Sequence, residues 1–71
     1  MKNTKGMKRV RGLEKTHFDM SIRAWKIYNY TDPFDIYEEE TEDGFRYSVR
    51  GCLGDYDDLT AEEVEEMLIN F

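Results

Sequence analysis

The chain has 71 residues, which allows one small domain whose folding removes only about 60% of the unfolded surface from water. Hydrophobic residues make up 39% and charged residues 37% of the sequence, a balance that argues against a second domain and against a roomy enclosed active site. The longest unbroken apolar run, Met67-Leu68-Ile69, is far shorter than the roughly 20 residues that a membrane-spanning helix needs.

The formal net charge of −6 conceals two parts of opposite sign. Through Ile27 the chain carries eight Lys or Arg against two acids, a net charge of +6. From Tyr28 onward it carries 14 acids against two Arg, a net charge of −12. The acidic part would attract a basic protein surface and repel nucleic acid, which only the basic part would attract.

Residues 1–19 are basic, with few periodic apolar positions, and Gly6 and Gly12 discourage a continuous helix. We predict a flexible basic N-terminal arm over residues 1–19 and an acidic domain over residues 20–71. The single cysteine cannot close a disulfide within the chain, and no apolar stretch follows the N-terminal charges as in a secretory signal. These features are typical of a cytoplasmic protein.

Residues 22–31 are rich in aromatic and β-branched side chains, which favours a strand. The competing interpretation is a helix with Phe18, Ile22 and Trp25 on one stripe. Asp32-Pro33 ends the element in either case, because proline lacks an amide donor and biases the preceding residue away from helix.

A β-hairpin is the next predicted element. Apolar and polar residues alternate on both sides of the turn sequence Thr41-Glu42-Asp43-Gly44, which suits a type I turn with a final glycine. This loop length sets four facing pairs, which are Ile36 with Val49, Glu38 with Tyr47, Asp35 with Arg50, and Glu39 with Arg46. A shift of one residue would lose the apolar match and the opposite-charge pairs together.

The C-terminal segment predicts a helix. Thr60 and Glu63 have the spacing of a capping box, and Val64, Leu68 and Phe71 form an apolar stripe at helical spacing. Residues 51–58 would connect the hairpin to this helix. The fold class that follows is α+β, a small two-layer domain with a three-stranded antiparallel sheet and one C-terminal helix in the order β-β-β-α.

Little in the sequence points to catalysis or to a cofactor. His17 is the only imidazole and falls in the predicted arm, while Cys52 is more typical of a small buried core residue than of a nucleophile. Asp55, Asp57 and Asp58 have the oxygen-rich character of calcium loops but lack the glycine and glutamate of that pattern. We expect a non-enzymatic protein with no cofactor and no metal.

Acidic and tyrosine side chains are the candidates for contact with a partner. Ten of the 71 residues are aromatic, more than a core of this size can enclose, and exposed tyrosines are favoured as interface anchors. Carboxylates on a rigid scaffold can compete with phosphates for a cationic channel, although they could equally serve solubility alone. The predicted contact residues are Tyr37, Glu38, Glu40, Glu42, Asp43, Asp55, Tyr56, Asp57 and Asp58.

The function expected from these features is occlusion of a basic surface on a larger protein, and the expected partner is a nucleic-acid-processing enzyme. In size, acid-rich composition and lack of catalytic residues, the chain is similar to small phage or mobile-element inhibitors, including anti-CRISPR and anti-restriction proteins. This resemblance is one of composition and implies inhibition without assigning any residue. The alternative is a regulatory protein that contacts nucleic acid through basic side chains of the arm, which are Lys5, Lys8, Arg9, Arg11 and Lys15.

Overall fold

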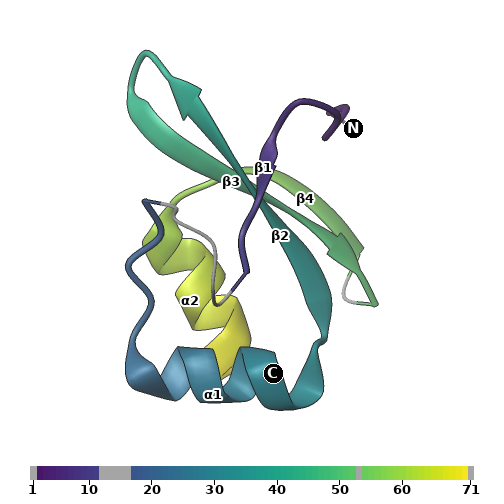
Figure 1. The fold of residues 1–71 in the computed structure, drawn as a ribbon, viewed down its shortest axis with the longest axis vertical. Coiled ribbons are helices and arrows are strands. Elements are labelled where there is room, and N and C mark those ends of the chain that lie inside the picture. The colour runs from purple at the N-terminus through teal and green to yellow at the C-terminus, as the bar shows by residue number, and fades with distance from the viewer. Residues whose placement is uncertain (1, 12–16, 53, 71) are drawn as a thin grey trace.

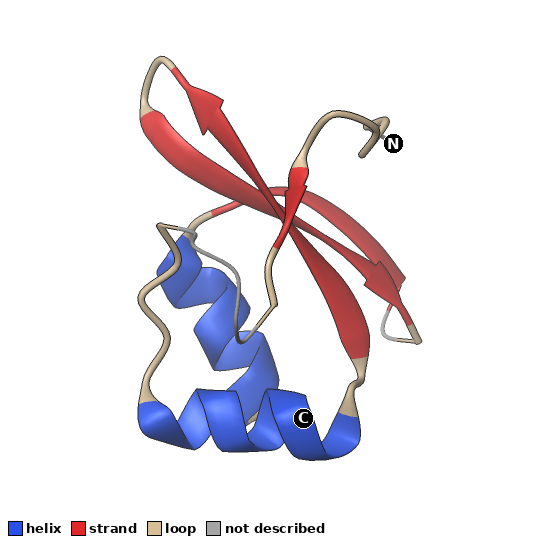
Figure 2. Ribbon diagram, viewed as in Figure 1, coloured by secondary structure: helices blue, strands red, loops and turns tan. Residues whose placement is uncertain are grey.

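The computed structural model describes residues 2–11, 17–52 and 54–70. The elements in chain order are β1 (Lys8–Arg9), α1 (Ile22–Thr31), β2 (Phe34–Thr41), β3 (Gly44–Gly51), β4 (Gly54–Leu59) and α2 (Ala61–Ile69). The strands form one antiparallel sheet in the order β1-β2-β3-β4, and both helices lie on the same side of it (Figure 1 and Figure 2). The fold is thus the expected small α+β domain with a C-terminal helix. The described residues contain four strands and two helices, however, and not three strands and one helix.

The core lies between the sheet and the two helices. It is built from Val10, Phe18, Met20, Ala24, Tyr28, Phe34, Ile36, Tyr47, Val49, Val64 and Leu68. Burying this apolar surface is the main favourable contribution to folding. Val10 and Phe18, which the sequence placed in the flexible arm, belong to this core, with 0% and 6% of their surfaces exposed.

The β2–β3 hairpin has the register that the sequence predicts. Ile36 lies opposite Val49, Glu38 opposite Tyr47, Asp35 opposite Arg50 and Glu39 opposite Arg46. Gly44 closes the turn with a φ of 105°, a left-handed conformation that side-chain-bearing residues rarely adopt. The turn and the alternating pattern agree, and together they specify the pairing.

The preference for a strand over residues 22–31 is wrong, because this segment is the helix α1. The Ser21 hydroxyl accepts a hydrogen bond from the Ala24 amide at 3.2 Å, and Asp32, in the left-handed conformation, ends the helix before Pro33. Ala24 and Tyr28, four residues apart, face the core. The competing helical interpretation is confirmed for the type of element, and Phe18 and Trp25 do contact the core, but Ile22 is 75% exposed and does not belong to that stripe.

Strand β1 replaces part of the predicted arm. Lys8 pairs with Glu38 and Arg9 with Tyr37, and the Val10 amide donates to the Ile36 carbonyl oxygen at 2.8 Å. A strand of two residues is too short to produce an alternating pattern, so periodicity could not reveal it. The segment is held to the sheet by this pairing and by the burial of Val10.

Strand β4 replaces part of the predicted connection. Its pairing with β3 shifts register between Tyr47 and Val49, and Asp58 has a φ of 58°. This irregularity interrupts the alternation of side chains between the two faces. Charged residues and an irregular backbone are common at sheet edges, where they discourage pairing with other chains.

The C-terminal helix α2 begins as predicted. The Thr60 hydroxyl accepts from the Glu63 amide at 3.2 Å, and a Glu63 carboxylate oxygen accepts from the Thr60 amide at 3.0 Å. This capping box satisfies two amide groups that helix formation would leave unpaired. Val64 and Leu68 are buried as expected, and Phe71 lies outside the described residues.

The position of Val10 makes the N-terminal segment testable as part of the folded unit. Val10→Ala should lower the free energy of unfolding by about 1–3 kcal/mol, because it removes buried methyl groups from a packed core. Lys5→Ala, an exposed change in the same segment, is the matched control and should lie within about 0.5 kcal/mol of the wild type. Urea unfolding monitored by circular dichroism measures both. Equal effects of the two changes would show that residues 2–11 do not contribute to the core.

Candidate protein-binding surfaces

The N-terminal cations lie against acidic side chains of the sheet. The Lys2 ammonium contacts a Glu39 carboxylate oxygen at 2.5 Å and also Asp58, and the hydrogen bonds that it donates to Asp58 and Glu39 raise the pKa of Lys2. The Arg9 guanidinium contacts Asp35 at 2.5 Å. The opposite charges of the two parts of the sequence therefore meet within one molecule.

Arg50 makes a second set of contacts on this surface. Its Nη2 atom donates to Asp57 Oδ1 and to the Lys2 carbonyl oxygen, both at 2.7 Å, and its Nη1 atom donates to the Tyr56 carbonyl oxygen at 3.1 Å. Arg50 thereby holds β4 and the N-terminal segment against β3. The predicted neighbours Asp35 and Arg50 do lie opposite each other, but their ion pairs are formed with Arg9 and Asp57.

Glu38 does not lie on the predicted contact surface. Only 6% of its surface is exposed, and its Oε2 atom accepts hydrogen bonds from the Tyr47 hydroxyl at 2.9 Å and from the His17 amide at 2.8 Å. Burial, followed by the hydrogen bond with Glu38, raises the pKa of Tyr47. The alternation of β2 turns Glu38 toward the core, where it connects the hairpin to the segment that precedes α1.

The other predicted contact residues fall into separate regions. Glu40, Glu42 and Asp43 are exposed at the end of the β2–β3 hairpin, and we call these three residues the hairpin tip. The pairings of β1 and β4 stop at Glu38 and Tyr47, so the hairpin continues beyond them with two strands and projects past the helices (Figure 2). Tyr37 is half-buried in β2. The structure therefore does not join all nine predicted residues into one surface.

Asp55 and Tyr56 are exposed on the edge strand β4, whereas Asp57 and Asp58 contact Arg50 and Lys2. Tyr56 also lines a groove of about 430 Å³ between β4 and α2, which we call the β4–α2 groove. The residues lining it are Tyr56, Leu59, Glu63, Glu66, Met67 and Asn70. The groove was not predicted, because residues 51–58 were interpreted as a connection between the hairpin and the C-terminal helix.

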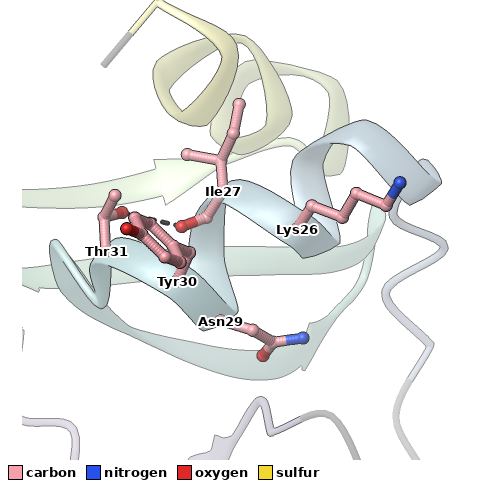
Figure 3. A pocket seen from close by; sticks show the side chains of 5 residues that line it. All are labelled: Lys26, Ile27, Asn29, Tyr30 and Thr31. Carbon is pink, nitrogen blue, oxygen red and sulfur yellow. Dashed lines mark hydrogen bonds between the residues drawn. The ribbon is translucent and has the colours of Figure 1, made fainter.

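A second hollow lies along α1. It has a volume of about 620 Å³ and is lined by Lys26, Ile27, Asn29, Tyr30 and Thr31 (Figure 3). Tyr30 is 92% exposed, and the Thr31 hydroxyl donates to the Ile27 carbonyl oxygen at 2.7 Å. The exposure of Tyr30 agrees with the expectation that some tyrosine rings remain at the surface, whereas the hollow along α1 was not predicted, because residues 22–31 were interpreted as a strand.

The two residues considered for nucleophilic catalysis are far apart. The His17 ring stacks on Phe45, near the start of β3, with 3.9 Å between the ring centroids. Cys52 follows the last residue of β3, and the intervening strand spans roughly 20 Å at about 3.3 Å per residue. Cys52 is exposed, which contradicts the expected core position, and its thiol donates to the Pro33 carbonyl oxygen at 2.9 Å.

Among the described residues, no group of three or more His, Cys, Asp or Glu side chains could hold a metal ion. In the same part of the chain, neither helix combines the length and apolar character needed to cross a membrane. No family model, curated protein or solved structure matches this chain.

The contact between Arg50 and Asp57 predicts a pH dependence of stability. Hydrogen bonding from Arg50 lowers the pKa of Asp57 from 3.8 to about 2. A carboxyl whose pKa is depressed by folding contributes stability above its unfolded pKa, and that stability is lost as pH falls through the folded value. In Asp57→Asn, the free energy of unfolding should therefore depend less on pH between 3.8 and about 2 than in the wild type.

Denaturant unfolding at several pH values across this window measures the effect. Asp43→Asn at the exposed hairpin tip is the control for removing one carboxyl group from a position without this arginine contact. A pH dependence in Asp57→Asn as steep as that of the wild type would contradict the assigned role of the Arg50 contact.

Proposed function

We propose that the protein is a non-enzymatic binding module that covers a basic, nucleic-acid-binding surface of a larger protein. The observation that carries this proposal is the position of the hairpin tip. Its three acids are exposed on a two-stranded extension that projects past the rest of the domain. Such an extension could enter a cationic channel built for the nucleic-acid backbone, where its carboxylates would replace phosphates.

The internal ion pairs support this proposal. Lys2 and Arg9 contact Glu39, Asp58 and Asp35, so these cations neutralise acids of the sheet and not those of the hairpin tip. The α2 helix adds a second acidic region, formed by Glu62, Glu63, Glu65 and Glu66. The proposed contact surface therefore keeps the hairpin tip and Tyr56 from the predicted residues and adds the acids of α2. It omits Glu38, Asp57 and Asp58.

Nucleic-acid binding through the N-terminal segment is less favoured. Arg9 contacts Asp35 and pairs with Tyr37 in the sheet, which makes it part of the folded domain. Of the basic residues assigned to that function, Lys15 lies outside the described residues. Lys5, Lys8 and Arg11 are exposed, but these residues offer fewer positive charges than the roughly 6–10 phosphate contacts of strongly salt-dependent nucleic-acid binding.

The proposal is tested by inhibition of a panel of purified nucleases, helicases and polymerases. At least one enzyme should lose activity, and the inhibition should weaken steeply with salt and be competed by excess DNA or RNA. The triple variant Glu40→Lys, Glu42→Lys and Asp43→Lys should inhibit at least about tenfold less, because it reverses the exposed charges of the tip.

The control is Glu14→Lys, Asp19→Lys and Lys5→Glu, which changes charges of the N-terminal region and should keep the inhibition. Reversing Asp57 or Asp58 is unsuitable, because it would also break the contacts with Arg50 and Lys2. Inhibition that persists at high salt, or an affected enzyme that DNA does not protect, would contradict the proposal. So would a panel in which no enzyme is inhibited.

A further inference from the structure

The β4–α2 groove combines an apolar wall with acidic side chains. Leu59 and Met67 are half-buried and pack against the core, while the exposed carboxylates of Glu63 and Glu66 line the groove from α2. Tyr56, which is 47% exposed, lines it from β4. A ligand that fills this groove needs an apolar stem and a positively charged end, which is the chemistry of a long basic side chain.

The elements that form the groove are fixed by contacts outside it. The backbone of Tyr56 is held by the hydrogen bond from Arg50 to its carbonyl oxygen. Gly54 has a φ of 106°, and a side chain built there would lie 3.5 Å from the Tyr56 ring, so the ring rests directly over the glycine. The capping box fixes the start of α2 and orients the Glu63 carboxylate. A site formed in advance loses less conformational entropy when it binds.

We propose that the β4–α2 groove receives an arginine side chain of a cationic protein partner. This inference deepens the proposed function and rests on it, because it names the group by which the basic surface is recognised at this groove. The planar guanidinium of arginine can stack on the exposed ring of Tyr56 while donating to carboxylates at its edge. Glu63 and Glu66 are three residues apart on one helix, with Cβ atoms about 5–6 Å from each other, and can both approach one guanidinium.

Lysine fits the same groove less well. Its ammonium group is compact and strongly hydrated, and it lacks the flat surface that stacks on an aromatic ring. The groove is therefore expected to prefer arginine to lysine at equal charge, whereas the hairpin tip, which offers exposed carboxylates without a lining ring, is expected to discriminate less.

The test is a titration of the full chain, labelled with ¹⁵N, with blocked tri-arginine, tri-lysine and tri-citrulline peptides. Tri-arginine should shift the amide resonances of Tyr56, Leu59, Glu66, Met67 and Asn70 in a saturable way. Tri-lysine should bind at least about threefold more weakly than tri-arginine, and the uncharged tri-citrulline should not bind measurably.

Two variants of the groove have matched controls. Glu66→Gln and Tyr56→Ser should each weaken tri-arginine binding about threefold, since they remove a carboxylate and the stacking ring. Tyr56→Phe keeps the ring, and Asp19→Asn removes one exposed carboxylate outside both the groove and the hairpin tip, so both should bind as the wild type does. The unchanged amide spectrum away from the groove verifies that each variant is folded.

Equal binding of tri-lysine and tri-arginine would overturn the inference, as would an equal loss of tri-arginine binding in Asp19→Asn and Glu66→Gln. The absence of saturable shifts at millimolar tri-arginine would also overturn it. If the shifts instead centre on the hairpin tip, the groove is not the arginine site, but the salt-sensitive inhibition expected of the proposed function would still stand. If tri-arginine binds at the groove but no enzyme of the panel is inhibited, the arginine site would stand and the proposed function would be wrong.

Discussion

The docking of the N-terminal segment on the sheet, through burial of Val10 and pairing of opposite charges, is the constraint that determines how charge is distributed over the domain. Asp35 and Glu39 belong to β2, and Asp57 and Asp58 belong to β4, the two strands that flank β3, so that like charges on them would repel one another across it. Lys2 and Arg9 contact three of them, and Arg50 contacts Asp57. Each exposed pair contributes little by itself, but here the pairs accompany the burial of Val10 and the pairing of β1 with β2.

This internal neutralisation determines where negative charge remains. Lys2, Arg9 and Arg50 contact acids of β2 and β4, so the two groups of exposed acids outside these contacts lie at the hairpin tip and on α2, while Asp19, Asp32 and Asp55 are exposed singly. A strongly unequal charge distribution usually serves association with an oppositely charged partner as well as solubility. In the structure, basic residues of the N-terminal segment contact acids of the sheet, so the charges of the two parts of the sequence partly neutralise each other within one molecule.

Elements whose residues act on their near neighbours in the sequence were predicted correctly. Elements whose conformation is determined by contacts between residues distant in the sequence were not. The turn glycine Gly44 and the pair Thr60 and Glu63 act on their own neighbours, and the hairpin register and helix start follow from them. Strand propensity failed for residues 22–31 because the caps and the burial of Tyr28 outweigh it. Glu38 was predicted to be an exposed contact residue, but it faces the core. A carboxylate can occupy this position because it accepts a hydrogen bond from Tyr47, the residue opposite it on β3.

The hairpin tip and the β4–α2 groove would act at different stages of one association. Exposed carboxylates on an extension act over a Debye length of about 8–10 Å, and they speed encounter with a cationic surface while discriminating little between its side chains. A groove with an aromatic wall acts only on contact, where the shape of the bound group matters as well as its charge. Because Tyr56 and the hairpin tip lie in separate regions of the sheet, a partner that satisfies both must present positive charge over an extended surface. That requirement fits a channel that follows a nucleic-acid backbone better than it fits an isolated basic patch.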